Sequence, residues 1–142
     1  MIEHQQQPTK TSCGPTCIAM IVKRDARSII DMLPSVRSEK RKKKRTHDTN
    51  IAEVVALLAR FGYAVDRRLK IDTITDSGEE FGLLRVHHAR KTGTGHRSGW
   101  HWCLLAEGCV FDPLMFDDMD ASVFFDESKT HKIFFYAVTK AS

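Results

Sequence analysis

The sequence lacks any uninterrupted apolar run close to the roughly 20 residues that a helix needs to cross a bilayer. Its first residues also lack the basic flank and apolar core of a secretory signal, so we expect a cytoplasmic location. Cysteine is scarce, with four residues in 142, and in that location we expect free thiols rather than disulfides. With 42% hydrophobic and 28% charged residues, the sequence predicts a single globular domain over residues 1–142.

Excess positive charge is confined to one stretch. The formal net charge is +4, but Arg37 to Arg45 contains seven basic and one acidic side chain, so the rest of the chain is slightly acidic. We expect residues 35–47 to form a basic, mobile loop with almost nothing to bury. The alternative is that Arg37 to Arg45 binds an acidic partner such as nucleic acid or an anionic surface.

Hydrophobic periodicity predicts helices in the first half of the chain and strands in the second. Helices are expected from Cys13 to about Lys23, from an Asp25 cap to Pro34, and from a cap at Asp48 or Thr49 to Gly62. Extended segments are expected at residues 63–65, 69–74, 82–88, 100–106, 109–113 and 132–138, with turns at 76–80 and 107–108. Residues 91–99 are predicted to be a glycine-rich loop, and residues 117–130 a polar connection. Helices followed by an antiparallel sheet give an α+β fold class.

A helix start near the beginning of the chain carries the strongest chemical signal. Ser12 is placed as an N-cap, Cys13 as the first helical residue, and Pro15 within the first turn. The Cys13 thiol would then lie beside unpaired backbone N–H groups at the positive end of the helix dipole, which favour the thiolate. We therefore predict that Cys13 is a nucleophile and that the other three cysteines are small core residues.

A nucleophilic thiol requires a base and a group that orients the base. His101 falls in a predicted strand, and the hairpin turn that follows returns the chain so that Asp112 lies beside it. The alternative interpretation of His101 is a satisfied core histidine. Gln7, six residues before Cys13, is the candidate side-chain donor to an oxyanion, although the neighbouring glutamines leave this choice open by a residue or two.

These residues occur in an order that resembles the papain-like cysteine peptidases. The residues that carry the resemblance are Gln7, the Cys13–Gly14–Pro15 helix start, the Gly99–Trp102 strand and Phe111–Asp112–Pro113. The sequence is closest to the bacteriocin-processing, double-glycine leader peptidase branch. Peptidases of that branch usually precede a membrane transporter, whereas this chain carries no transmembrane or nucleotide-binding segment.

The resemblance implies a papain-like fold, in which N-terminal helices pack on a C-terminal antiparallel sheet and the nucleophile begins the core helix. It implies Cys13 as nucleophile, His101 as general base and then acid, Asp112 as its orienter, and Gln7 as oxyanion donor. Gly14, Trp100 and Trp102 are the candidate substrate-binding residues, with core packing equally open for the two tryptophans.

The predicted function is hydrolysis of a peptide or isopeptide bond in a peptide or protein substrate, through an acyl-enzyme and without a cofactor. The same triad can also deamidate or cross-link a glutamine side chain. A non-catalytic alternative is an adaptor that binds a polyanion through the basic loop. A zinc site built from the four cysteines fits poorly, because gaps of three and five residues differ from the usual knuckle spacings, and no metal is expected.

Overall fold

The computed structural model describes residues 1–70, 80–92, 95–128 and 131–141. The described helices are α1 (Cys13–Val22), α2 (Ala26–Ile30), α3 (Leu33–Val36), the 3-10 turn η1 (Arg41–Lys43), α4 (Ile51–Arg60) and α5 (Ala121–Glu127). The strands are β1 (Tyr63–Lys70), β2 (Gly82–Thr92), β3 (Gly95–Ala106), β4 (Cys109–Phe111), β5 (Met119–Asp120) and β6 (Lys132–Lys140). The predicted α+β class, with helices first and an antiparallel sheet later, is confirmed. Within the described part of the chain, no helix is both long and apolar enough to span a bilayer.

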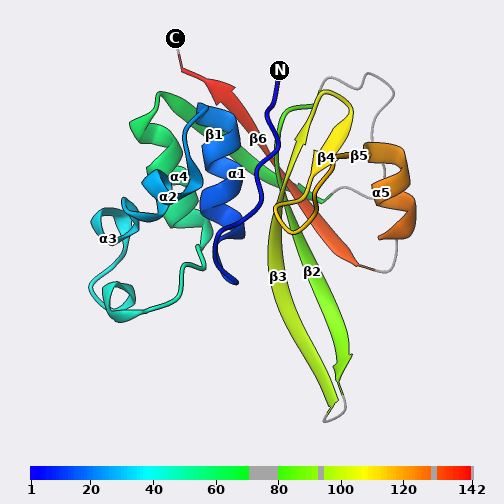
Figure 1. Cartoon of the computed structure of the whole chain (residues 1–142), viewed down its shortest axis with the longest axis horizontal. Helices are drawn as coiled ribbons and strands as arrows, with labels where there is room; N and C mark the ends of the chain where they lie inside the picture. The colour runs from blue at the N-terminus through cyan, green and yellow to red at the C-terminus, as the bar shows by residue number, and fades with distance from the viewer. Residues whose placement is uncertain (71–79, 93–94, 129–130, 142) are drawn as a thin grey trace.

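The sheet separates the N-terminal helices from α5 (Figure 1). Its six antiparallel strands lie in the order β1-β6-β2-β3-β4-β5, so the last strand of the chain is inserted near the middle. The described pairing of β4 with β3 covers only Leu104 to Ala106. The part of β3 that precedes Leu104 is therefore not paired with β4.

The alternation of β3 divides the core into two clusters. Trp102 and Leu104 pack with α1 and α4 on one face of the sheet, whereas Cys103 and Leu105 pack with α5 on the other. Side chains two residues apart on a strand share a face, which places His101 on the same side as Cys103. The strand thus presents its aromatic core residue and its candidate base in opposite directions.

Several predicted boundaries are confirmed. The Asp25 side chain caps α2 by accepting from the Arg27 N–H, and Gly62 follows α4 with a φ of 82°. The turn between β3 and β4 has positive φ at both Glu107 and Gly108, as a tight hairpin requires. Strand β6 forms where the apolar alternation predicted it.

Other predictions are wrong in detail. Helix α4 is capped by Asn50 rather than by Asp48 or Thr49, because Asn50 and Glu53 form a reciprocal capping box. Pro34 does not end the second helix but lies in the first turn of α3, where its missing N–H costs no hydrogen bond. The described residues of the predicted 91–99 loop are strand, and helix α5 occupies part of the predicted polar connection. Most of the predicted 76–80 turn lies outside the described residues.

The basic loop contains more internal contacts than predicted. The Arg37 guanidinium is buried and donates to the carbonyl oxygens of Lys44, Thr46 and Asp48. Arg41 donates through two nitrogens to the buried Glu53 carboxylate, at 2.7 and 3.0 Å. The expectation that residues 35–47 have almost nothing to bury is therefore wrong, because two arginines anchor the loop to α4.

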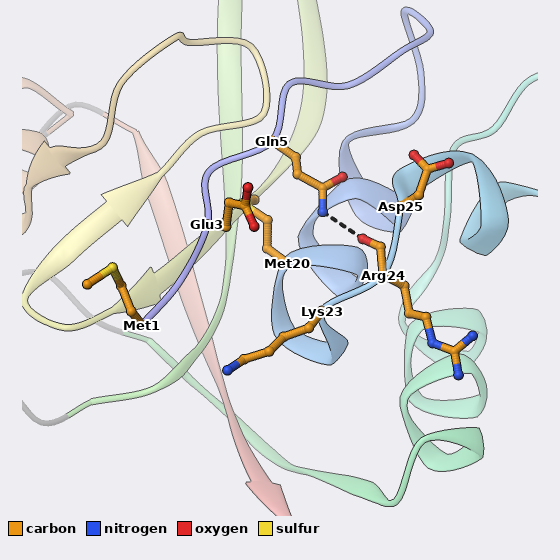
Figure 2. A pocket seen from close by; sticks show the side chains of 7 residues that line it. All are labelled: Met1, Glu3, Gln5, Met20, Lys23, Arg24 and Asp25. Carbon is orange, nitrogen blue, oxygen red and sulfur yellow. Dashed lines mark hydrogen bonds between the residues drawn. The ribbon is translucent and has the colours of Figure 1, made fainter.

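The segment before α1 crosses between the helices and the sheet (Figure 1). Gln5 joins it to the helices by donating to the Arg24 carbonyl and accepting from the Ala26 N–H, beside a pocket of about 490 Å³ (Figure 2). This pocket is lined by Lys23, the C-cap of α1, and so lies at the opposite end of that helix from Cys13. Its position separates it from the candidate active site.

Candidate active site

Cys13 is the first residue of α1, as the sequence predicted. Ser12 occupies the N-cap position, but its hydroxyl donates to the Thr9 carbonyl and accepts from the Thr9 N–H. No side-chain cap covers the start of this helix, which is part of the described chain. The first-turn amides therefore keep the local positive potential that stabilises an anion, either a thiolate or the oxygen of a tetrahedral intermediate.

The middle of β3 and the segment after β4 bring the predicted base and its orienter together. His101 Nε2 donates to Asp112 Oδ1 at 2.6 Å. The backbone N–H of Leu114 donates to the same carboxylate oxygen at 2.9 Å, which fixes the carboxylate independently of the imidazole. The His101 side chain is 12% exposed and that of Asp112 is 23% exposed, so the pair is largely shielded but reachable.

The Cys13 sulfur lies against the unpaired edge of β3. The backbone N–H of Trp102 donates to Cys13 Sγ over 3.5 Å, at the point where β4 no longer covers the strand. Residue 102 directly follows His101, and the Cys13 side chain is near enough to His101 to help raise the pKa of the imidazole. A thiol from residue 13 thus meets an imidazole from residue 101, and a carboxylate from residue 112 holds the far side of that imidazole.

The surroundings of His101 favour its protonated form. Burial lowers the pKa of His101, but the hydrogen bond to Asp112 and the neighbouring Cys103 and Cys13 side chains outweigh burial and raise it well above the ordinary value of 6.5. A protonated imidazole at this position is suited to give a proton to a leaving group.

Gln7 supports this site in a way that the sequence did not indicate. Its backbone N–H donates to the Pro113 carbonyl at 2.8 Å, and its side-chain amide donates to the carbonyl oxygens of Thr9 and Lys10. Both described donor interactions of the amide are with the approach to α1. The role of Gln7 as oxyanion donor stays a prediction, and it requires that amide to exchange a carbonyl for the substrate oxygen.

The structure corrects two of the predicted substrate-binding residues. Trp102 is 2% exposed, packs 5.7 Å from the Tyr136 ring and donates from Nε1 to the Thr49 carbonyl. Gly14 is also buried, and a Cβ there would lie 1.9 Å from Thr49 Oγ1. Both residues position α1 against β3 rather than face a substrate.

Trp100 remains compatible with substrate binding because it is 45% exposed. Its ring lies 4.5 Å from that of His87, and the Arg85 guanidinium stacks over it at 4.4 Å. These contacts hold a large flat surface in place on the strand that carries His101, on the face that Trp100 shares with Trp102.

Two contributors to the site were missed from the sequence. Cys103 was assigned to the core, yet its sulfur lies within 4.8 Å of a ring nitrogen of His101 and of a carboxylate oxygen of Asp112, and burial raises its pKa to about 11. The signal was present, because residues 101 and 103 of one strand share a face. His4 Nε2 donates to the Asp112 backbone carbonyl at 2.8 Å, and no local pattern predicted this pairing across 108 residues.

Comparison with known protein families and with curated proteins gives no match. Among solved structures, the chain is similar to the crystal structure of the peptidase domain of Streptococcus ComA, a bifunctional ABC transporter involved in a quorum-sensing pathway. The two share 12% identity over 96% of this chain and 98% of that one, with a TM-score of 0.47. The fold resembles that peptidase domain. No residue is assigned from the comparison, and the site rests on its own geometry.

Proposed function

We propose that this chain is a cysteine peptidase that cleaves a peptide or isopeptide bond through an acyl-enzyme. The observation that carries the proposal is the position of His101, which binds the Asp112 carboxylate at 2.6 Å and directly precedes Trp102, whose backbone N–H donates to Cys13 Sγ. Acyl transfer by a thiol requires a nucleophile next to a base, and a further group that orients the base.

The chemistry follows from the positions of these groups. The Cys13 thiol gives its proton to His101, and the sulfur attacks the carbonyl carbon of the substrate to form a C–S bond. The negative oxygen that results faces the uncapped start of α1. His101 then protonates the leaving amine as the C–N bond breaks, and a water deprotonated by His101 hydrolyses the thioester.

The surface beside Asp112 suits an apolar side chain of a peptide. A cavity of about 230 Å³ opens there, and its apolar lining residues are Val110, Met115, Met119 and Phe124. Phe116, at the edge of the same loop, is 82% exposed. An exposed apolar surface next to a nucleophile is typical of a substrate-binding region.

Hydrolysis is favoured over the non-catalytic alternative. The adaptor hypothesis requires the basic loop to offer its charges to a polyanion, but Arg37 and Arg41 are already bound to Glu53 and to backbone carbonyls. Deamidation or cross-linking of a glutamine side chain uses the same triad, and only the acceptor of the acyl group and the bond attacked differ.

The test is competitive alkylation with substoichiometric iodoacetamide near neutral pH, followed by peptide mapping. Cys13 is expected to be labelled first, because Cys17 and Cys103 are fully buried with raised pKa values and burial also raises the pKa of Cys109. Cys109→Ala is the matched control, since it removes the most accessible of the other thiols. Equal labelling of all four cysteines would contradict the proposal.

The reaction itself is tested by mass spectrometry on a peptide library. Cleaved products establish hydrolysis, a gain of about one mass unit on glutamine establishes deamidation, and a joined pair establishes cross-linking. Loss of every product in Cys13→Ala, with unchanged thermal unfolding, is the expected control result.

A further inference from the structure

Three different metal-binding atoms surround one point beside the candidate nucleophile. A ring nitrogen of His101, the sulfur of Cys103 and a carboxylate oxygen of Asp112 all lie within 4.8 Å of one another. The proposed acyl transfer uses His101 and Asp112 but gives no role to Cys103. A fully buried thiol directed at a histidine and an aspartate therefore calls for a separate explanation.

The set matches the donors preferred by a zinc ion. Thiolate, imidazole and carboxylate are its usual protein ligands, in tetrahedral geometry with bonds of about 2.0–2.3 Å, which separates neighbouring donors by roughly 3.3–3.8 Å. The spacing below 4.8 Å falls close to this range. His101 and Asp112 now lie 2.6 Å apart at their hydrogen bond, so an ion would separate them by roughly 1 Å.

We propose that His101, Cys103 and Asp112 form a binding site for one Zn²⁺ ion, and that the ion switches the site off by occupying the imidazole. The binding half of this proposal stands on the donor geometry alone, and only the inhibitory half rests on the proposed function. Cys103 is the residue that distinguishes the metal site from the acyl-transfer site.

The route to the site and the fourth ligand are both available. Asp112 lines the cavity beside Met115 and Met119, so an ion reaches the carboxylate from solvent before it meets the buried sulfur. Water from the open cavity is available as the fourth ligand.

Cobalt(II) is the probe for the test, because it adopts tetrahedral zinc sites and absorbs visible light. Titration of the purified full chain is expected to give one Co²⁺ per chain, with a sulfur-to-cobalt charge-transfer band that Zn²⁺ abolishes. Cys103→Ala is expected to weaken binding by at least about tenfold and to remove that band or reduce its intensity. Cys109→Ala, which changes a thiol outside the set, should bind as wild type.

Two further measurements distinguish loss of this metal site from misfolding of the variant and from metal binding at another site. Thermal unfolding without metal shows whether Cys103→Ala is folded, and Asp112→Asn serves as a second variant that leaves every thiol in place. X-ray absorption on the zinc-loaded wild type is expected to show at least one sulfur and one imidazole nitrogen. A shell of oxygen and nitrogen alone, or unchanged binding by both variants, would overturn the proposal.

Failure of the metal site and failure of the proposed function give different results. Zinc is expected to protect Cys13 from iodoacetamide in wild type and in Cys109→Ala, but not in Cys103→Ala. A chain that binds cobalt as described yet shows no selective Cys13 labelling keeps the metal site and loses the peptidase. A chain with selective labelling and no metal binding at 1:1 stoichiometry loses the metal site only.

Discussion

Two buried charged clusters in this molecule resemble each other in composition and differ in what surrounds them. In the first, Arg37 and Arg41 bind Glu53, whose side chain is 2% exposed. In the second, His101 binds Asp112 at the edge of β3. Both join segments that are distant in the sequence, and both contain a carboxylate next to a cation.

The difference is the number of partners that each cluster already has. The Glu53 carboxylate accepts from Arg41 and from the Asn50 backbone, and although burial raises its pKa, these partners lower it below its usual value. The cluster is closed and contains no nucleophile. The His101 cluster adds a thiol, an uncapped helix start and a cavity, so a substrate can approach it. Perturbed ionisation alone therefore does not separate a structural ion pair from a reactive site.

The largest effect is expected from His101→Ala, which should reduce peptide cleavage by about 10²- to 10⁴-fold, because it removes the general base. Its effect on the free energy of unfolding should be smaller at pH 9 than at pH 6, because the contribution of His101 protonation declines as pH rises, and the Leu114 N–H still binds the Asp112 carboxylate. Single-turnover kinetics and thermal unfolding of the same sample measure the two quantities. A large loss of stability with little loss of cleavage rate would show that the His101 cluster, like the Glu53 cluster, has a structural role only.

Glu53→Gln should have the opposite profile. It keeps the capping geometry of α4 but leaves the buried Arg37 and the partly exposed Arg41 without a carboxylate, at a cost of about 3 kcal/mol in the free energy of unfolding. Urea denaturation measures this cost. Glu39→Gln is the matched control, because the Glu39 side chain is 91% exposed and its pair with Lys42 is worth less than about 1 kcal/mol. Equal effects of the two changes would refute a stabilising role for the buried pair.

Gly14→Ala tests the contact between α1 and the rest of the site. The added methyl would meet Thr49 Oγ1 at 1.9 Å and Trp102 Cδ1 at 3.2 Å, so α1 must shift, with a loss of about 1–3 kcal/mol in the free energy of unfolding. Iodoacetamide labelling of Cys13 should slow as well. Gly62→Ala provides the comparison, since it introduces strain at a φ of 82° but meets no atom within 4 Å. Labelling at the wild-type rate in Gly14→Ala would be inconsistent with this packing.

The smallest expected effect is a pH dependence of stability that separates the clusters. His101 has a raised pKa in the folded state, so its protonation adds stability that is complete below about pH 6.5 and declines as pH rises toward the folded-state value. Asp112→Asn removes the main interaction that raises it. The difference in melting temperature between wild type and Asp112→Asn should therefore shrink from pH 6 to pH 9. A constant difference over that range would contradict the assigned protonation state.

The sequence was sufficient for features encoded locally. The helix start at Cys13, the Asp25 cap and the Glu107–Gly108 turn each depend on residues within a few positions of one another. The His101–Asp112 pair also belongs to this group, because a short hairpin joins the two residues. Periodicity and turn chemistry therefore predicted the α+β class and the residues that meet in the site.

The features that the sequence did not predict depend on packing between distant segments. Whether Trp102 faces a substrate or the core is decided by α1 and Tyr136, and whether Arg41 is solvated is decided by Glu53. The seven basic residues between Arg37 and Arg45 were interpreted by composition, whereas two of these arginines have specific buried partners. His4 reaches Asp112 only because the N-terminal segment crosses to the sheet.

The position of β6 between β1 and β2 has a consequence for the time at which this site can form. Residue 13 leaves the ribosome long before residues 132–140, and β1 cannot join β2 until those residues have been made. Pairing between strands that are distant in the sequence makes folding slow. Until β6 is present, the N-terminal helices have no complete sheet to pack against. We expect nascent chains that end before residue 132 to lack a selectively reactive Cys13, so that this reactivity arises only after β6 has been synthesised.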